Sequence, residues 1–112
     1  FITRNGNVTQ FVSTYRRAWH AGISCLKTGE SERERCNDFS IGIELEGTDS
    51  STFSDLQYET IASLARVLHR AHPIAYWRAH SEIAPGRKTD PGPYFDWDRL
   101  LGQAQIPGHM RP

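Results

Sequence analysis

The chain has 112 residues, of which thirteen are basic and thirteen acidic, and 38% of them are hydrophobic. This length suits one domain or part of one, and a net charge of zero gives no electrostatic basis for binding nucleic acid or an anionic membrane. No apolar run approaches the roughly 18 residues of a transmembrane helix, and no secretory signal is visible at the N-terminus. The first residue is Phe1 rather than methionine, so we expect the chain to begin inside a longer protein.

The first residues predict a β-hairpin. Strand-forming residues occupy positions 1–3 and 8–12, and Asn5-Gly6 lies between them. An Asn-Gly pair suits the positive φ angles of a type I′ turn, which joins two antiparallel strands.

Positions 14–39 show no regular pattern and predict irregular chain. The mixed charge run at positions 30–35 is typical of a solvated loop or a frayed helical turn. Cys25 and Cys36 lie in this region, and their spacing does not suit a CxxC metal or redox pair. With no secretory signal in view, reduced thiols are favoured over a local disulfide.

Positions 40–46 form the clearest predicted strand. Its residues alternate with a period of two, so one apolar face should pack on the core while the other presents two carboxylates. The apolar face consists of Ile41, Ile43 and Leu45, and the carboxylates belong to Glu44 and Glu46.

Two helices are predicted in the second half of the chain. Ser54 and Gln57 have the spacing of a capping box, and apolar residues at helical spacing follow up to His72-Pro73. A closing helix should span positions 96–104, because it begins with an acidic cap and continues with apolar residues at helical spacing.

The segments around the closing helix have weaker patterns. Positions 74–80 are rich in aromatic residues and predict a short strand. Positions 81–93 predict a loop that prolines stiffen and glycines bend. Residues 105–112 predict a loose tail.

The densest chemical pattern lies in the loop after the last predicted strand. His80 should end that strand, and Asp90 returns ten residues later across a segment that prolines restrict. An imidazole and a carboxylate brought to one point can form half of a zinc site, with Lys88 as a cation beside it. Spacing alone favours a simpler alternative, in which His80 is structural and Asp90 caps the turn before Pro91.

Glu44 is a second candidate. On a strand whose other face is buried, its carboxylate can lie in a cleft and act as a general base. The alternative is a solvated strand face on which Glu44 and Glu46 are both exposed.

The run Trp19-His20-Ala21-Gly22 is a third candidate. A tryptophan beside a histidine, followed by two small residues, suits an aromatic wall that lets a ligand approach closely. The alternative is a core tryptophan at position 19 next to an ordinary surface histidine.

Three stretches together change the weight of these candidates. They are Arg17–Gly22, Cys36–Asp49 and Ile83–Pro93, and they occur in this order. The chain resembles the 1,6-anhydro-N-acetylmuramyl-L-alanine amidases of the AmpD type from Phe1 to about Leu101. The resemblance implies an α/β fold in which a mixed β-sheet is flanked by helices. Residues 1–104 would be the C-terminal two-thirds of a single zinc amidase domain, and residues 105–112 a tail.

The resemblance also implies a zinc site, although part of it is absent. His80 and Asp90 match two of the family's three zinc ligands. The family's first zinc histidine lies on an early central strand in a Val-His-Asn-like context, and nothing in this sequence matches it. We therefore expect an N-terminally truncated domain that alone binds zinc weakly and has little amidase activity. Recruitment of His20 as a replacement fits less well, because a catalytic site needs three preplaced ligands and an open fourth position.

Four further residues match functional positions of the family. Glu44 matches the residue that activates the attacking water, and Lys88 matches the cation beside the reacting carbonyl. Arg35 and Trp19 match positions that contact the substrate or line its cleft.

The implied function is zinc-dependent hydrolysis of the amide between (anhydro-)N-acetylmuramic acid and L-alanine of muropeptides, during cell-wall recycling in the bacterial cytoplasm. No membrane, nucleic acid or obligate protein partner is expected. Two alternatives stay open at this point: a module that binds peptidoglycan or muropeptides without cutting them, and a secreted amidase that acts on the intact cell wall.

Overall fold

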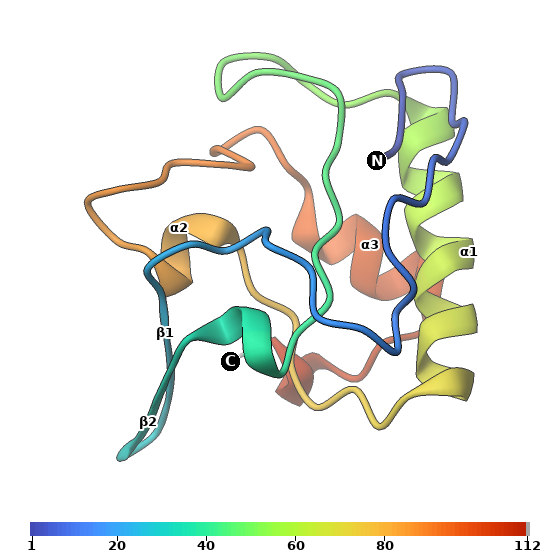
Figure 1. The fold of residues 1–112 in the computed structure, drawn as a ribbon. Coiled ribbons are helices and arrows are strands. Elements are labelled where there is room, and N and C mark those ends of the chain that lie inside the picture. The colour runs from blue at the N-terminus through green and yellow to red at the C-terminus, as the bar shows by residue number, and fades with distance from the viewer. Residues whose placement is uncertain (112) are drawn as a thin grey trace.

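The computed structural model describes residues 1–111. Within them a long helix and a shorter one pack together, and a small hairpin projects on the other side of the molecule (Figure 1). The strands are β1 (Cys25–Thr28) and β2 (Ser31–Glu34), and the helices are α1 (Asp55–Ala71), α2 (His80–Ile83) and α3 (Trp97–Ala104). Two short 3₁₀ turns are η1 (Cys36–Asp38) and η2 (Gly108–Met110). No helix in the described range is long and apolar enough to span a bilayer.

Helix α1 begins and ends where the sequence predicted. The Ser54 side chain accepts a hydrogen bond from the Gln57 amide, and the Gln57 side chain accepts one from the Ser54 amide. This reciprocal capping box satisfies two of the amides that a helix start leaves unpaired. At the other end, the predicted stop at His72-Pro73 is confirmed, because His72 is already extended.

The core lies between α1 and α3. Leu100 of α3 is fully buried and packs with Ile61 and Ala65 of α1. Ile2 is also fully buried, and it joins the N-terminal strand segment to the same cluster. The closing helix predicted at positions 96–104 is thereby confirmed, with the Asp96 side chain accepting a hydrogen bond from the Arg99 amide.

The N-terminal hairpin is present, but its turn differs from the prediction. Ile2 and Val8 form an antiparallel bridge. Gly6 has a φ of 81°, whereas Asn5 does not have a positive φ. A type I′ turn needs positive φ at both central residues, so this connection is instead a longer loop that uses the left-handed conformation at glycine alone. The Gly6 amide donates to the Thr3 carbonyl oxygen across 2.8 Å and closes the loop.

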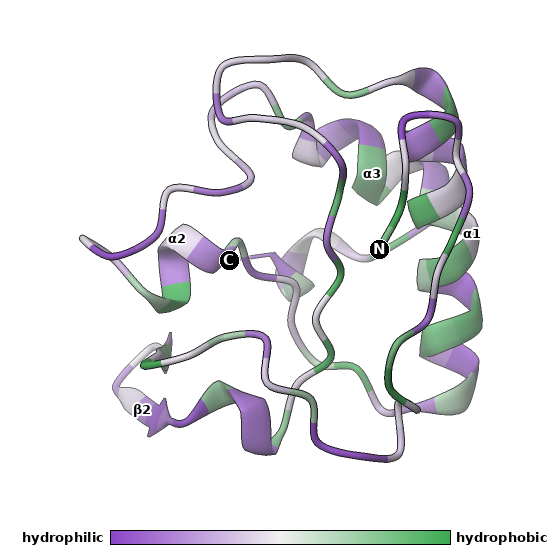
Figure 2. Ribbon diagram, turned by 45° about the horizontal axis from the view of Figure 1, so that its top comes forward, coloured by the Kyte–Doolittle hydropathy of each residue, from purple (hydrophilic) through white to green (hydrophobic). Residues whose placement is uncertain are grey.

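The region at positions 14–39 is more regular than predicted. The charge run lies mainly in β2, which pairs antiparallel with β1 so that Cys25 faces Glu34 and Thr28 faces Ser31. All four residues of β2 are exposed, and Figure 2 colours the strand as hydrophilic. An exposed loop and an exposed strand can have the same charged composition, so the sequence does not distinguish them without the partner strand. Cys25 and Cys36 are both free thiols.

The strand predicted at positions 40–46 keeps its two faces but lacks a full ladder of hydrogen bonds. Ile43 and Leu45 pack against the core, and Glu44 and Glu46 are exposed, as the alternation predicted. Among residues 1–111, only Ile2 pairs with this segment, through a parallel bridge to Leu45.

The strand predicted at positions 74–80 is wrong for the described residues, since it has no strand pairing and His80 starts α2. Residues 41–45 and 73–80 instead line a cavity of about 990 Å³. A strand needs a hydrogen-bonded neighbour, and within residues 1–111 these two segments do not pair with each other.

The tail is not loose over the residues that the structure describes. Ile106 is buried in the core cluster, and the Met110 carbonyl oxygen accepts a hydrogen bond from the Trp77 amide at 2.8 Å. Arg111 forms an ion pair with Glu82 at 2.6 Å. Because these contacts join residues distant in sequence, the local composition of the tail did not reveal them.

Candidate functional site

His80 and Asp90 meet in the structure. His80 is the first residue of α2 rather than the last residue of a strand, and the loop after α2 brings Asp90 back to it. The Ser81 amide donates to the Asp90 carbonyl oxygen at 3.1 Å, which closes this loop. The His80 Nδ1 atom lies 3.1 Å from Asp90 Oδ2, and the His80 side chain is only 15% exposed. The predicted convergence of these two residues is therefore present.

The second nitrogen of His80 has a different partner. Its Nε2 lies 2.9 Å from the Ala21 carbonyl oxygen. A carbonyl oxygen and a carboxylate both accept hydrogen bonds, while a neutral imidazole carries a single hydrogen. A neutral ring that donates Nε2–H to Ala21 has a lone pair at Nδ1, so a cation between Nδ1 and Asp90 would satisfy both contacts together.

The separation of the pair also fits a metal. Two ligands of a tetrahedral zinc ion, each about 2.0–2.1 Å from it, are about 3.3 Å apart. The 3.1 Å between Nδ1 and Oδ2 is close to that value. Among residues 1–111, however, no group of three or more His, Cys, Asp or Glu side chains is gathered closely enough to hold a metal ion. The pair by itself has the chemistry and spacing of half a zinc site.

Glu44 lines the same cavity as His80 and Asp90. It is exposed, so its carboxylate is in contact with solvent at the cavity rather than sealed from it. Glu46, on the same face, has a hydrogen-bond partner of its own: its Oε2 accepts a hydrogen bond from the Arg4 amide at 2.8 Å. The two carboxylates that the sequence placed on one face thus have different environments.

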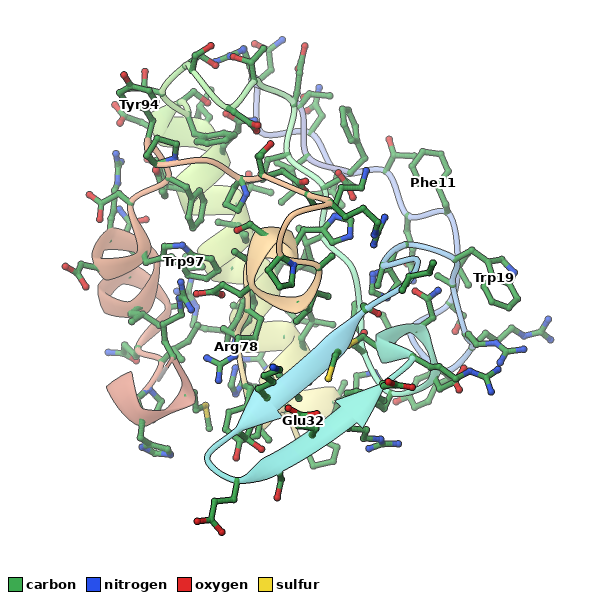
Figure 3. All side chains as sticks on the ribbon, turned by 90° about the vertical axis from the view of Figure 1, so that its left-hand side faces the viewer. Phe11, Trp19, Glu32, Arg78, Tyr94 and Trp97 are labelled. Carbon is green, nitrogen blue, oxygen red and sulfur yellow. The ribbon has the colours of Figure 1, made fainter. Side chains whose placement is uncertain are left out.

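The other three candidate residues lie outside the described lining of this cavity. Lys88 is exposed on the loop that carries Asp90. Arg35 has a φ of 61° and pairs with Asp38 at 3.5 Å. Trp19 is 79% exposed at the edge of the molecule (Figure 3), with the Arg17 guanidinium 4.6 Å from its ring centroid. Their roles in substrate binding and catalysis stay predictions.

His20 packs against the segment at positions 40–44. Its Nε2 lies 3.3 Å from the Ser40 hydroxyl, and a Cβ atom on Gly42 would be 2.6 Å from its ring. Burial lowers the pKa of His20 from its ordinary 6.5, and the charge of His80 lowers it further, while that of Glu44 raises it. His20 therefore lies within electrostatic reach of both His80 and Glu44.

This lowered pKa predicts a loss of stability in acid. The unfolded chain binds a proton at His20 near pH 6.5 and the folded chain only at lower pH, so stability is full above 6.5 and falls as the pH drops below it. We expect His20→Phe, which keeps a ring but cannot titrate, to lose less stability than the parent chain between about pH 7.5 and about pH 5.5. Urea unfolding midpoints of both chains, measured across this pH range, test the prediction. If the midpoints of the two chains change equally with pH, the lowered pKa of His20 is contradicted.

Sequence reasoning did not anticipate the hydrogen bonds that fix the position of His80. Asn37, Ala21 and Arg87 connect the loop at positions 19–23 to His80. The only local signal was their position inside the stretches that carry the resemblance. Hydrogen bonds to backbone atoms more than ten residues away leave no periodic pattern in a sequence.

Comparisons with known proteins show the family of this chain. Residues 1–93 match the model of the N-acetylmuramoyl-L-alanine amidase family. The chain is 47% identical over 110 residues to the 1,6-anhydro-N-acetylmuramyl-L-alanine amidase AmpD of Salmonella typhimurium, covering 96% of this chain and 57% of that protein. The chain spans only about half the length of the curated AmpD relatives that it matches.

Two solved structures are also similar to this chain. A crystal structure of a selenomethionine AmpD derivative has a TM-score of 0.81 and 48% identity, covering 89% of this chain and 55% of the other. A complex of Escherichia coli AmiD has a TM-score of 0.73 and 37% identity, covering 87% of this chain and 40% of the other. That complex contains the substrate anhydro-N-acetylmuramic acid-L-Ala-D-γ-Glu-L-Lys. The expected α/β fold is thereby confirmed.

Proposed function

Since this chain belongs to the N-acetylmuramoyl-L-alanine amidase family, we propose that it is the part of a zinc amidase that carries two metal ligands and the catalytic carboxylate. The reaction is hydrolysis of the amide between (anhydro-)N-acetylmuramic acid and L-alanine of a muropeptide. The observation that carries the proposal is the pair His80–Asp90, whose Nδ1 and Oδ2 face each other at 3.1 Å while Nε2 contacts the Ala21 carbonyl oxygen.

His80 Nδ1 and Asp90 Oδ2 would hold the zinc ion, together with a third ligand from outside the described residues. Zinc supplies a Lewis acid that polarises an amide carbonyl and makes hydroxide available near neutral pH. Ala21 accepts the remaining hydrogen of the His80 ring and so keeps the Nδ1 lone pair directed at the metal position.

Glu44 and Lys88 would act on the substrate. Glu44 lines the same cavity as the pair and accepts the proton of the attacking water, which it then passes to the leaving nitrogen of L-alanine. Lys88, on a flexible four-carbon stem two residues before Asp90, stabilises the negative charge that develops on the carbonyl oxygen. Such stabilisation typically lowers a barrier by about 3 kcal/mol. Trp19 and Arg35 are the proposed substrate contacts.

The degree of identity supports the AmpD type of substrate. The chain is 47% identical to an AmpD relative and 38% identical to the AmiD relative of Escherichia coli. We propose that its activity serves muropeptide recycling, and we propose separately that the reaction takes place in the cytoplasm. The muropeptide named for the AmiD complex, anhydro-N-acetylmuramic acid-L-Ala-D-γ-Glu-L-Lys, is the natural test substrate.

The second candidate function is muropeptide binding without cleavage. It is favoured by one observation: within residues 1–111 no third side chain completes a metal site with His80 and Asp90. Binding would still use the cavity, and catalysis would not occur.

The deciding experiment compares the 112-residue chain with a chimera. The chimera joins two pieces. The first is the segment of the Salmonella AmpD relative that lies before the region matching this chain, and the second is the 112-residue chain itself. We expect the 112 residues alone to bind zinc weakly and to cut the anhydro-muropeptide little or not at all, whereas the zinc-loaded chimera should release free L-alanine peptide. Stoichiometric zinc retained by the short chain after dialysis would overturn the need for a further ligand. A chimera that binds zinc and substrate without cleavage would favour the binding module.

A further inference from the structure

Arg87 has no role in the mechanism above, although it lies within the loop that carries Asp90. Its guanidinium group donates to two carbonyl oxygens of one short segment. Nη2 donates to Ala21 and, at 2.8 Å, to Ile23, and Nε donates to Ile23 at 3.2 Å. The Ala21 oxygen is the same atom that contacts His80 Nε2. We propose that Arg87 is a positioning residue, which fixes the Ala21 carbonyl and thereby the orientation of the His80 ring.

The Ala21 peptide is held on its other side as well. The Asn37 side-chain oxygen accepts hydrogen bonds from the amides of Ala21, at 2.8 Å, and His20, at 3.1 Å. Ala21 is 1% exposed and Asn37 9% exposed, so water does not compete freely for these bonds. With its amide bound to Asn37 and its carbonyl bound to Arg87, Ala21 cannot shift without breaking bonds on both sides.

The segment has a shape that suits this guanidinium. Gly22 has a φ of 63°, a conformation in which side chains are strained. A Cβ atom at Gly22 would lie 3.0 Å from both Nη1 and Nη2 of Arg87, so the guanidinium rests directly on the glycine backbone. A planar fork with donors on two edges can reach both flanking carbonyls, whereas a lysine ammonium is a single point of charge.

The consequence reaches the metal through the imidazole. A metal-binding histidine is oriented by the hydrogen bond of its other nitrogen, and loss of such a partner typically costs about 10–100-fold in metal affinity. If Ala21 moves, Nε2 loses its acceptor and the ring can turn Nδ1 away from Asp90. This inference rests on the proposed zinc site for its effect on metal binding, but its effect on the ring is independent of metal.

The test therefore has two arms and a matched control. Arg87→Met removes the fork, and Arg87→Lys keeps the charge with fewer donors. The control is Arg66→Met, which removes another exposed arginine that donates to a distant carbonyl, that of Gln103 at 2.7 Å. In the first arm, proton NMR of the metal-free chain measures solvent exchange of the His80 Nε2 hydrogen. In the second arm, competition with a chromogenic chelator measures the Kd of zinc for the chimera and for its variants.

We expect Arg87→Met to speed exchange of the Nε2 hydrogen about tenfold or more. We expect it also to raise the Kd of zinc about 10–100-fold. For both the exchange rate and the Kd of zinc, Arg87→Lys should give values between those of Arg87→Met and the parent. Arg66→Met should change neither quantity, even if it lowers the thermal stability as much as Arg87→Met does. Unchanged exchange in Arg87→Met, or no protected Nε2 hydrogen in the parent chain, overturns the positioning role. Faster exchange in Arg87→Met, when neither the parent chimera nor its Arg87→Met form binds any zinc, keeps the positioning role and overturns the proposed zinc site.

Discussion

Replacing Asp90 with alanine is expected to abolish zinc retention by the chimera. The substitution removes Oδ2, which lies 3.1 Å from His80 Nδ1, and leaves the imidazole as the sole described ligand. His80 and the one further ligand that the added segment supplies do not hold zinc against dialysis, because protein sites use three or four ligands. Metal content after dialysis, measured by elemental analysis, gives the result directly.

Asp90→Asn makes this test more specific. The amide has the shape of the carboxylate and can keep a hydrogen bond to His80, but it lacks the negative charge that a divalent ion requires of this ligand. We expect Asp90→Asn to preserve the thermal midpoint better than Asp90→Ala and still to lose zinc. Asp98→Ala, which replaces an exposed aspartate in the first turn of α3, is the control and should keep the metal. Zinc retained by both Asp90 variants would show that the pair is a structural hydrogen bond.

Glu44→Gln is expected to remove amide cleavage from the zinc-loaded chimera while leaving its zinc content unchanged. Glutamine has the size of glutamate but cannot accept the proton of the attacking water. General-base contributions are typically about 10²–10⁴-fold, so we expect kcat to fall by about that factor with little change in KM. Release of the L-alanine peptide, followed by chromatography, measures the rate.

Glu46→Gln is the matched control for this prediction. Glu46 lies on the same exposed face two residues away, but its carboxylate accepts a hydrogen bond from the Arg4 amide rather than lining the cavity. We expect this variant to keep full activity and to lose only some stability. Equal losses in the two variants would indicate that the segment at positions 40–46 needs its charge for folding, and full activity in Glu44→Gln would remove the general-base role.

The candidate site was predicted in part from short sequence patterns. The proline-restricted loop allowed Asp90 to return to His80, although spacing alone favoured separate structural roles for the two residues, and the structure brings them together. The alternation at positions 40–46 indicated that Glu44 lies opposite the buried face, and it does. What these patterns could not predict is the second contact of the imidazole, because Ala21 lies 59 residues before His80 in the chain.

The sequence by itself determined the elements whose stabilising contacts are local. Helix α1 has its cap, its apolar stripe and its stop within its own residues, and α3 likewise begins at its own acidic cap. Helical hydrogen bonds join residues four apart, so the information lies in a short window. The resemblance that identified the family also lies in contiguous stretches of sequence.

The tertiary structure alone decided which extended segments pair and what holds the site. Residues 25–34 form the β1–β2 hairpin, while positions 74–80, which have the better strand composition, border a cavity without pairing. A strand depends on a neighbour that can be anywhere in the chain, and so does the hydrogen-bond acceptor of a histidine ring. The clamp of Asn37 and Arg87 on Ala21 is of this kind, since its bonds span 16 and 66 residues.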